Sequence, residues 1–193
     1  MTAIAGSKFY TSFSSAFSPG GPNDLRWEDL KVPLSTAKAP ASDFPNHTTF
    51  KNGINAYSFG ASANEYLNFE TQLPHGWLAG SEIQPHIHWA PSSTSTGSVV
   101  WALEYTIASI NGTYGASTII SGAFPGEGTA YKHQMSNFPV ISLSGETMSC
   151  VMVGRLVRSG SHSLDTYVDG AFGLSFDIHY QTDGIGSHTI VTK

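Results

Sequence analysis

The fold is decided by the stretch Glu82-Ile83-Gln84-Pro85-His86-Ile87-His88-Trp89, in which polar and apolar side chains alternate without a break. In an extended chain the apolar members point to one side, whereas His86 and His88 point to the other. A period of two is typical of a β-strand with one buried face and one solvent-facing face. The sequence therefore predicts a strand over residues 83–89 that carries both histidines on its polar face.

The same period continues through the rest of the chain. Residues 99–107 and 174–180 alternate in the same way. Further strands are predicted over residues 54–60, 64–72, 117–121, 137–143 and 147–158. Turn-forming clusters separate these segments, and no amphipathic helix exceeds two turns. About eight strands with short turns and no crossover helices predict an all-β protein. We expect an antiparallel β-sandwich of the jelly-roll type over residues 51–193.

Residues 1–50 differ from the rest because proline recurs through them. Each proline fixes φ, removes a hydrogen-bond donor and favours extended backbone before it. We therefore predict an extended, Pro-rich N-terminal arm over residues 1–50. Its one helix-like segment is residues 24–30, on which Trp27 and Leu30 would share one side. A segment this short does not hold a helix alone in water, so we expect these two side chains to dock on their own domain or on a neighbouring subunit.

Composition excludes several classes of protein. The chain has 193 residues, with 9 Lys and Arg against 14 Asp and Glu and a formal net charge of -5. So few basic residues among more numerous acids do not form the dense basic surface that duplex binding requires, and we expect no direct contact with nucleic acid. The single cysteine, Cys150, excludes an intramolecular disulfide framework. We expect no signal peptide and no membrane span, because neither pattern is present.

His86 and His88 form a candidate metal site. On a strand their side chains project from one face about 6.6 Å apart, a separation at which two imidazoles can share one divalent ion. The spacing from Gly80 to the two histidines resembles the opening of the cupin metal motif, and cupins are small jelly rolls. The positions at which that motif carries a carboxylate hold Ser92 and Ser93 in this chain.

A complete ligand set is not recognisable in the sequence. His179, Glu70 and Glu104 are the residues that other strands can supply. The other interpretation is that the two strand histidines are hydrogen-bonded residues of a polar face or lie at a subunit interface. Because no further ligand stands at an interpretable spacing, we expect no bound metal and no cofactor.

Catalytic and ligand-binding signals are weak. No nucleophile elbow, Walker loop or dinucleotide-binding glycine motif is present, so we identify no catalytic residues and expect no enzyme activity. Cys150 alternates with two methionines and is expected to be a buried, unreactive thiol. Trp77, Tyr114 and Tyr131 fall in predicted loops, where they can form a platform that stacks on a sugar. For Trp77 the alternative is structural anchoring of its loop.

One long segment is distinctive. Residues 67–89 contain Leu73-Pro74-His75-Gly76-Trp77, followed by Pro85-His86-Ile87-His88-Trp89. This pattern resembles uncharacterised structural proteins of tailed bacteriophages. Residues 27–30, 101–105 and 176–180 fit the same resemblance, which covers most of the chain from about residue 27. The resemblance implies a virion component, and it transfers no catalytic residue.

Our expectation for function combines this resemblance with the predicted fold. We expect a capsid decoration, or cement, protein of a phage virion, assembled in the host cytoplasm, that forms a homotrimer and contacts the major capsid protein or other virion proteins. The residues expected at its interfaces are Trp27, Leu30, Glu82, His86, His88, Asp177 and His179. Two alternatives remain. One is a receptor- or glycan-binding domain of a tail or head fibre, and the other is a cupin-like metalloenzyme centred on His86 and His88.

Overall fold

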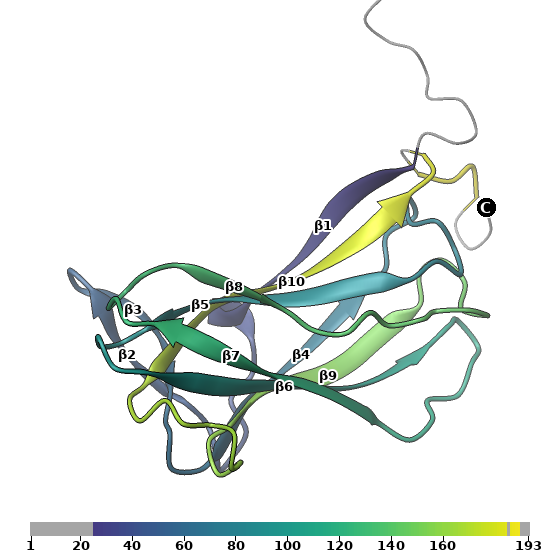
Figure 1. The fold of residues 1–193 in the computed structure, drawn as a ribbon. Coiled ribbons are helices and arrows are strands. Elements are labelled where there is room, and N and C mark those ends of the chain that lie inside the picture. Colours follow the sequence, from purple (N-terminus) through teal and green to yellow (C-terminus); the bar gives the residue numbers. More distant parts are fainter. Residues whose placement is uncertain (1–24, 185, 190–193) are drawn as a thin grey trace, which may run out of the picture.

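A computed structural model describes residues 25–184 and 186–189 of the chain. Within them, ten strands form two antiparallel sheets that pack face to face (Figure 1). The predicted all-β, antiparallel sandwich of jelly-roll type is thereby confirmed. Residues 1–24, which make up the first half of the predicted arm, lie outside the described residues.

The larger sheet is built around one long strand, β10 (Ala171–Thr182). One edge of β10 pairs with β5 (Ile83–Pro91). The other edge pairs with β3 (Ile54–Phe59) at its start and with β1 (Arg26–Pro33) along the rest. The outer strands are β2 (Asn46–Lys51), next to β3, and β8 (Gln134–Asn137), next to β5.

The smaller sheet has four strands in the order β4-β9-β6-β7. Their bounds are β4 Asn64–Gln72, β6 Thr96–Ala108, β7 Thr118–Glu127 and β9 Val151–Ser159. The helix in the described residues is a single 3-10 turn, η1 (Leu34–Thr36). No helix in this part of the chain is therefore long enough to cross a membrane.

The core lies between the two sheets and is rich in aromatic rings. Ile87 and Trp89 of β5 are fully buried in it, as is Trp101 of β6. The Trp101 ring packs edge-on against Phe59 with 5.0 Å between centroids. Because neighbouring side chains on a strand point to opposite faces, burial of Ile87 and Trp89 places His86 and His88 on the outer face of the larger sheet.

The structure corrects the prediction for the segment around Trp27. The helix-like residues 24–30 fall largely in strand β1, which pairs with β10 over eight residue pairs from Arg26↔Thr182 to Pro33↔Ser175. Trp27 and Leu30 therefore point to opposite faces of the sheet, and they do not share one side. Strands β1 and β2 both belong to the larger sheet, although residues 26–33 and 46–50 were predicted to be part of the arm.

Two further strands differ from their predicted limits. The predicted strand 137–143 is replaced by β8, which ends at Asn137, and by an isolated bridge between Ile83 and Ile141. Strand β7 begins within the predicted 117–121 and continues to Glu127, pairing with β6 from Thr96 to Tyr105. The other predicted strands lie at or near their predicted positions.

Candidate functional site

The register of the larger sheet gathers polar side chains on its outer face. Across the β10–β5 pair, Asp177 stands opposite His86, and Ser175 stands opposite His88. Two residues further along β10, His179 stands opposite Gln84 of β5 on one side and opposite Asp29 of β1 on the other. Directly opposed residues point to the same face of a sheet, so three strands contribute side chains to one cluster.

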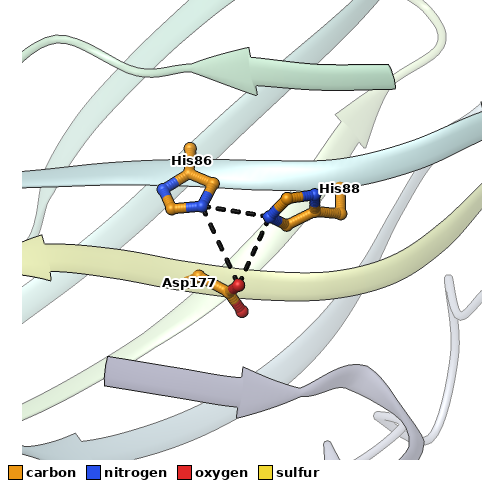
Figure 2. Close-up of side chains that lie close together, drawn as sticks. All are labelled: His86, His88 and Asp177. Carbon is orange, nitrogen blue, oxygen red and sulfur yellow. Dashed lines mark hydrogen bonds and ion pairs between the residues drawn. The ribbon is translucent and has the colours of Figure 1, made fainter. Parts of the chain in front are cut away.

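His86, His88 and Asp177 form the centre of this cluster (Figure 2). The two Nε2 atoms are 3.1 Å apart. Oδ2 of Asp177 lies 3.8 Å from Nε2 of His86 and 3.3 Å from Nε2 of His88. Figure 2 shows the two imidazoles of β5 and the carboxylate of β10 all pointing toward the same spot. One nitrogen from each ring and one carboxylate oxygen therefore converge.

A second set of contacts fixes the orientation of these three side chains. Nδ1 of His88 lies 2.7 Å from Nε2 of His133, which is exposed in the loop before β8. The hydroxyl of Ser175 donates a short hydrogen bond to Oδ1 of Asp177. The ring of His179 packs on that of His86 with 4.2 Å between centroids. Each member of the central group is thus held by a neighbour.

The central side chains are shielded from solvent to different degrees. The exposed fraction of the side chain is 2% for His86, 6% for Asp177 and 23% for His88. Burial lowers the pKa of His86, and the nearby rings of His179 and His88 lower it further, although Asp177 partly opposes them. Burial also lowers the pKa of His88, against the opposing effect of Asp177. A lowered pKa favours the uncharged imidazole, in which one ring nitrogen keeps a lone pair.

A hollow of about 430 Å³ lies beside the cluster on the same face. Its lining residues are Trp27, Glu28, Asp29, Gln84 and His179. Nε2 of His179 lies 2.9 Å from Oδ1 of Asp29. Trp27 is 57% exposed, although a large aromatic side chain normally gains stability from burial. This face therefore combines an exposed aromatic side chain, a hollow and a close His179–Asp29 contact.

Most of the residues predicted for an interface are found on this face, which we call the outer face of the larger sheet. Trp27, His86, His88, Asp177 and His179 lie on it together. Glu82 is exposed just before β5. Leu30 is the exception, because it packs against the core. The interface role itself remains a prediction.

The carboxylates suggested as metal ligands lie elsewhere. Glu70 and Glu104 stand on β4 and β6 of the smaller sheet, so neither can complete a site with the histidines of β5. Glu104 instead accepts hydrogen bonds from Ser117 and Arg155, which lower its pKa. The sequence signal that was missed is Asp177, which was assigned to the interface but not to a metal. His133 was not identified at all.

The structure separates the aromatic candidates. Trp77 is fully buried and its indole Nε1 donates to Oγ of Ser81 at 2.9 Å, so its ring anchors the loop and is not available to stack on a sugar. Tyr114 and Tyr131 are 45% and 40% exposed. Cys150 is buried in the core, and burial raises the pKa of its thiol to about 12, which makes the thiol unreactive at neutral pH.

Comparisons with known proteins bear on the fold alone. No protein-family model matches the chain, and no curated protein matches it either. Among solved structures, the chain is similar to a family 35 carbohydrate-binding module from Clostridium thermocellum, at 11% identity and a TM-score of 0.43, over 78% of this chain and 97% of that one. A CBM35 module from Cellvibrio japonicus matches at 13% identity and a TM-score of 0.42, over 86% of this chain and 99% of the module.

A viral chain shows a comparable likeness. The structure of infectious bursal disease virus, Gx strain, matches at 14% identity and a TM-score of 0.42, over 84% of this chain and 33% of the viral chain. A cycloisomaltooligosaccharide glucanotransferase from Paenibacillus is also similar, and there the match covers 76% of this chain but only 18% of the enzyme. At such identities the likeness is one of β-sandwich architecture, and function has to be argued from the surface of this chain.

Proposed function

We propose that the chain is a bacteriophage virion structural protein, a capsid decoration protein that forms a homotrimer and stabilises the head by contacts with the major capsid protein. The observation that carries this proposal is the outer face of the larger sheet. Residues far apart in the sequence, from Trp27 to His179, meet there around an open hollow. One of the phage-like motifs of the sequence lies in this sheet, since Pro85-His86-Ile87-His88-Trp89 belongs to β5.

Physical chemistry supports an interface at this face. Interface hot spots are enriched in tryptophan, and an exposed tryptophan beside a hollow can fill a pocket on a partner while the partner fills the hollow. The face is carried by paired strands, so its backbone is already ordered and loses little entropy on association. In this proposal the outer face of the larger sheet forms the contacts among the three copies. The assembled trimer then binds the capsid shell.

The first test of this proposal is the oligomeric state of the full chain. Light scattering after size-exclusion chromatography is expected to give a trimer at micromolar concentration, and the trimer is expected to bind empty capsids. Trp27→Ala is expected to weaken trimer formation at least about tenfold, the effect of losing one modest aromatic anchor. Ile119→Ala is the matched control, because Ile119 is 64% exposed on the smaller sheet. A chain that stays monomeric and does not bind empty capsids would contradict the proposal.

A second candidate function is glycan or receptor binding, and the surroundings of Tyr131 favour it. The ring of Tyr131 is backed by Phe50 and Phe172, with 5.5 and 6.1 Å between centroids. Nζ of Lys51 lies 5.3 Å from the centre of the ring. A solvent-facing ring held rigidly from behind is suited to stacking on the apolar face of a sugar.

The second test is therefore binding to host-cell glycans. Tyr131→Ala is expected to weaken binding about tenfold, because a stacking contact contributes on the order of 1 kcal/mol. Tyr131→Phe keeps the ring and is expected to keep most of the affinity. Glycan binding by the wild-type chain that persists unchanged in Tyr131→Ala would exclude this ring as the site.

A further inference from the structure

We propose that His86, His88 and Asp177 bind one divalent transition-metal ion on the outer face of the larger sheet. The proposal does not depend on the virion function, because it rests only on the positions of three side chains. Two imidazole nitrogens and one carboxylate oxygen form a donor set that suits zinc and its neighbours in the first transition row. Magnesium and calcium instead prefer sites made of oxygen atoms.

The dimensions of the group fit a metal ion. The three donor atoms form a triangle with edges of 3.1, 3.3 and 3.8 Å. The point equidistant from the three corners lies about 2.0 Å from each, which matches zinc–nitrogen and zinc–oxygen bonds of about 2.0–2.2 Å. An ion at or just above this point reaches all three donors without movement of the backbone. The exposed side of His88 leaves room for water as a further ligand.

The hydrogen bonds around the group fit the same interpretation. A metal-bound histidine usually donates its second ring N–H to a fixed acceptor. When Nε2 of His88 binds the ion, Nδ1–H of this ring can donate to Nε2 of His133 at 2.7 Å. Oδ1 of Asp177 is held by Ser175, which leaves Oδ2 for the ion. Lys31 stands opposite Asp177 in the β1–β10 pair, but among the described residues it makes no ion pair with that carboxylate.

Without an ion, the three converging atoms are only partly paired with one another. Nε2 of His86 and Nε2 of His88, 3.1 Å apart, can share one proton in a hydrogen bond, but Oδ2 of Asp177 lies 3.8 Å from Nε2 of His86, too far for a hydrogen bond. Nδ1 of His86 is buried and has no hydrogen-bond partner of normal geometry in the described part of the chain, although the backbone of Gln84 acts weakly on this ring. An ion bound through Nε2 of His86 leaves this Nδ1 as it is. A bound ion satisfies the three converging donor atoms together.

The experiment is a titration with zinc chloride of the full chain, stripped with a chelator and carrying no added histidine tag. Calorimetry is expected to show one zinc ion per chain, and zinc is expected to raise the thermal unfolding midpoint. Cobalt, used as a spectroscopic probe, is expected to give visible absorption bands that zinc abolishes. Magnesium is expected to leave these bands unchanged.

Variants separate the ligands from their neighbours. Asp177→Asn and His88→Gln are expected to weaken zinc binding by more than about 100-fold, and loss of the supporting ring in His133→Ala by about tenfold. His47→Ala, which removes an exposed histidine of β2 far from the three ligands in the sequence, is expected to leave zinc affinity unchanged. Circular dichroism of each metal-free variant checks that it folds.

Two results of the zinc titration would contradict the metal site. Substoichiometric zinc binding by the folded wild-type chain at micromolar concentration would overturn the proposal. So would a zinc affinity that Asp177→Asn and His47→Ala reduce equally. The oligomeric state is recorded in the same samples, so a chain that binds zinc as a monomer would support the metal site while contradicting the trimer.

Discussion

Replacing Arg158 by methionine is expected to lower the free energy of unfolding by about 3–5 kcal/mol, the usual cost of removing one partner from a buried ion pair. The side chains of Arg158 and Asp165 are both fully buried. Nε and Nη2 of the arginine donate to the two carboxylate oxygens at 3.1 and 2.8 Å, which is the bidentate geometry. Removal of the guanidinium leaves the carboxylate charged, buried and without its counter-ion.

The guanidinium also joins separate parts of the sandwich. Nη1 donates to the carbonyls of Phe59, at the end of β3, and Asp169, and Nη2 donates to that of Tyr167. All five N–H groups of Arg158 are therefore used. Lysine offers three donors from a single point and cannot reproduce this fork. Arg158→Lys is accordingly expected to recover only a minor part of the lost stability.

Urea unfolding of the metal-free chain measures these changes. Arg155→Met is the matched control, three residues earlier on the same strand. Arg155 pairs with Glu104 at the surface, where its side chain is 41% exposed, and its loss is expected to cost less than about 1 kcal/mol. Asp165→Asn is expected to cost as much as Arg158→Met, because it leaves the arginine charge buried. If Arg155→Met and Arg158→Met lose equal amounts of unfolding free energy, burial of the Arg158–Asp165 pair does not explain the effect of Arg158→Met.

Two strands were predicted at or within their observed bounds. Residues 64–72 were predicted and observed as β4, and residues 83–89 lie within β5. Strand β1 was missed because its local sequence is helix-like, whereas the free edge of β10 provides eight backbone partners that no local pattern reveals. Tertiary pairing of this kind commonly overrides local propensity. Strand β2 was missed because its residues lie among prolines that suggested an arm.

The candidate site was predictable in its parts but not in its assembly. Alternation placed His86, His88, Asp177 and His179 on polar faces, and the structure agrees. The meeting of Asp177 with His86 depends on the register between β10 and β5, and alternation along a single strand carries no information on register. Arg158 was open to prediction, since it stands in phase with Met152 and Leu156, which are both buried. Its partner Asp165 lies in a loop, for which no pattern predicts burial.

Replacing Trp101 by alanine is expected to lower the free energy of unfolding by about 3–5 kcal/mol, because the cavity left by a large aromatic side chain cannot collapse fully. Trp101 lies at the centre of the smaller sheet, where β6 pairs with β9 on one side and β7 on the other. Its ring is fully buried and meets Phe59 and Trp89 of the opposite sheet, with 5.0 and 6.1 Å between centroids. The rigid frame of paired strands on both sides prevents neighbouring atoms from filling the space.

A comparison of two Trp→Phe variants tests whether packing or hydrogen bonding accounts for this loss. The indole Nε1 of Trp101 is buried without a hydrogen-bond partner in the described residues, so Trp101→Phe removes an unsatisfied donor together with some packing. Nε1 of Trp89 donates to Oγ of Ser136 at 2.9 Å, so Trp89→Phe leaves a buried hydroxyl without its partner, at an added cost of about 1–3 kcal/mol. Urea unfolding is therefore expected to rank Trp101→Ala as the most destabilised, then Trp89→Phe, then Trp101→Phe. If Trp101→Phe loses more stability than Trp89→Phe, this ranking is wrong. The indole nitrogen of Trp101 would then have a hydrogen-bond partner whose loss adds to the loss of packing.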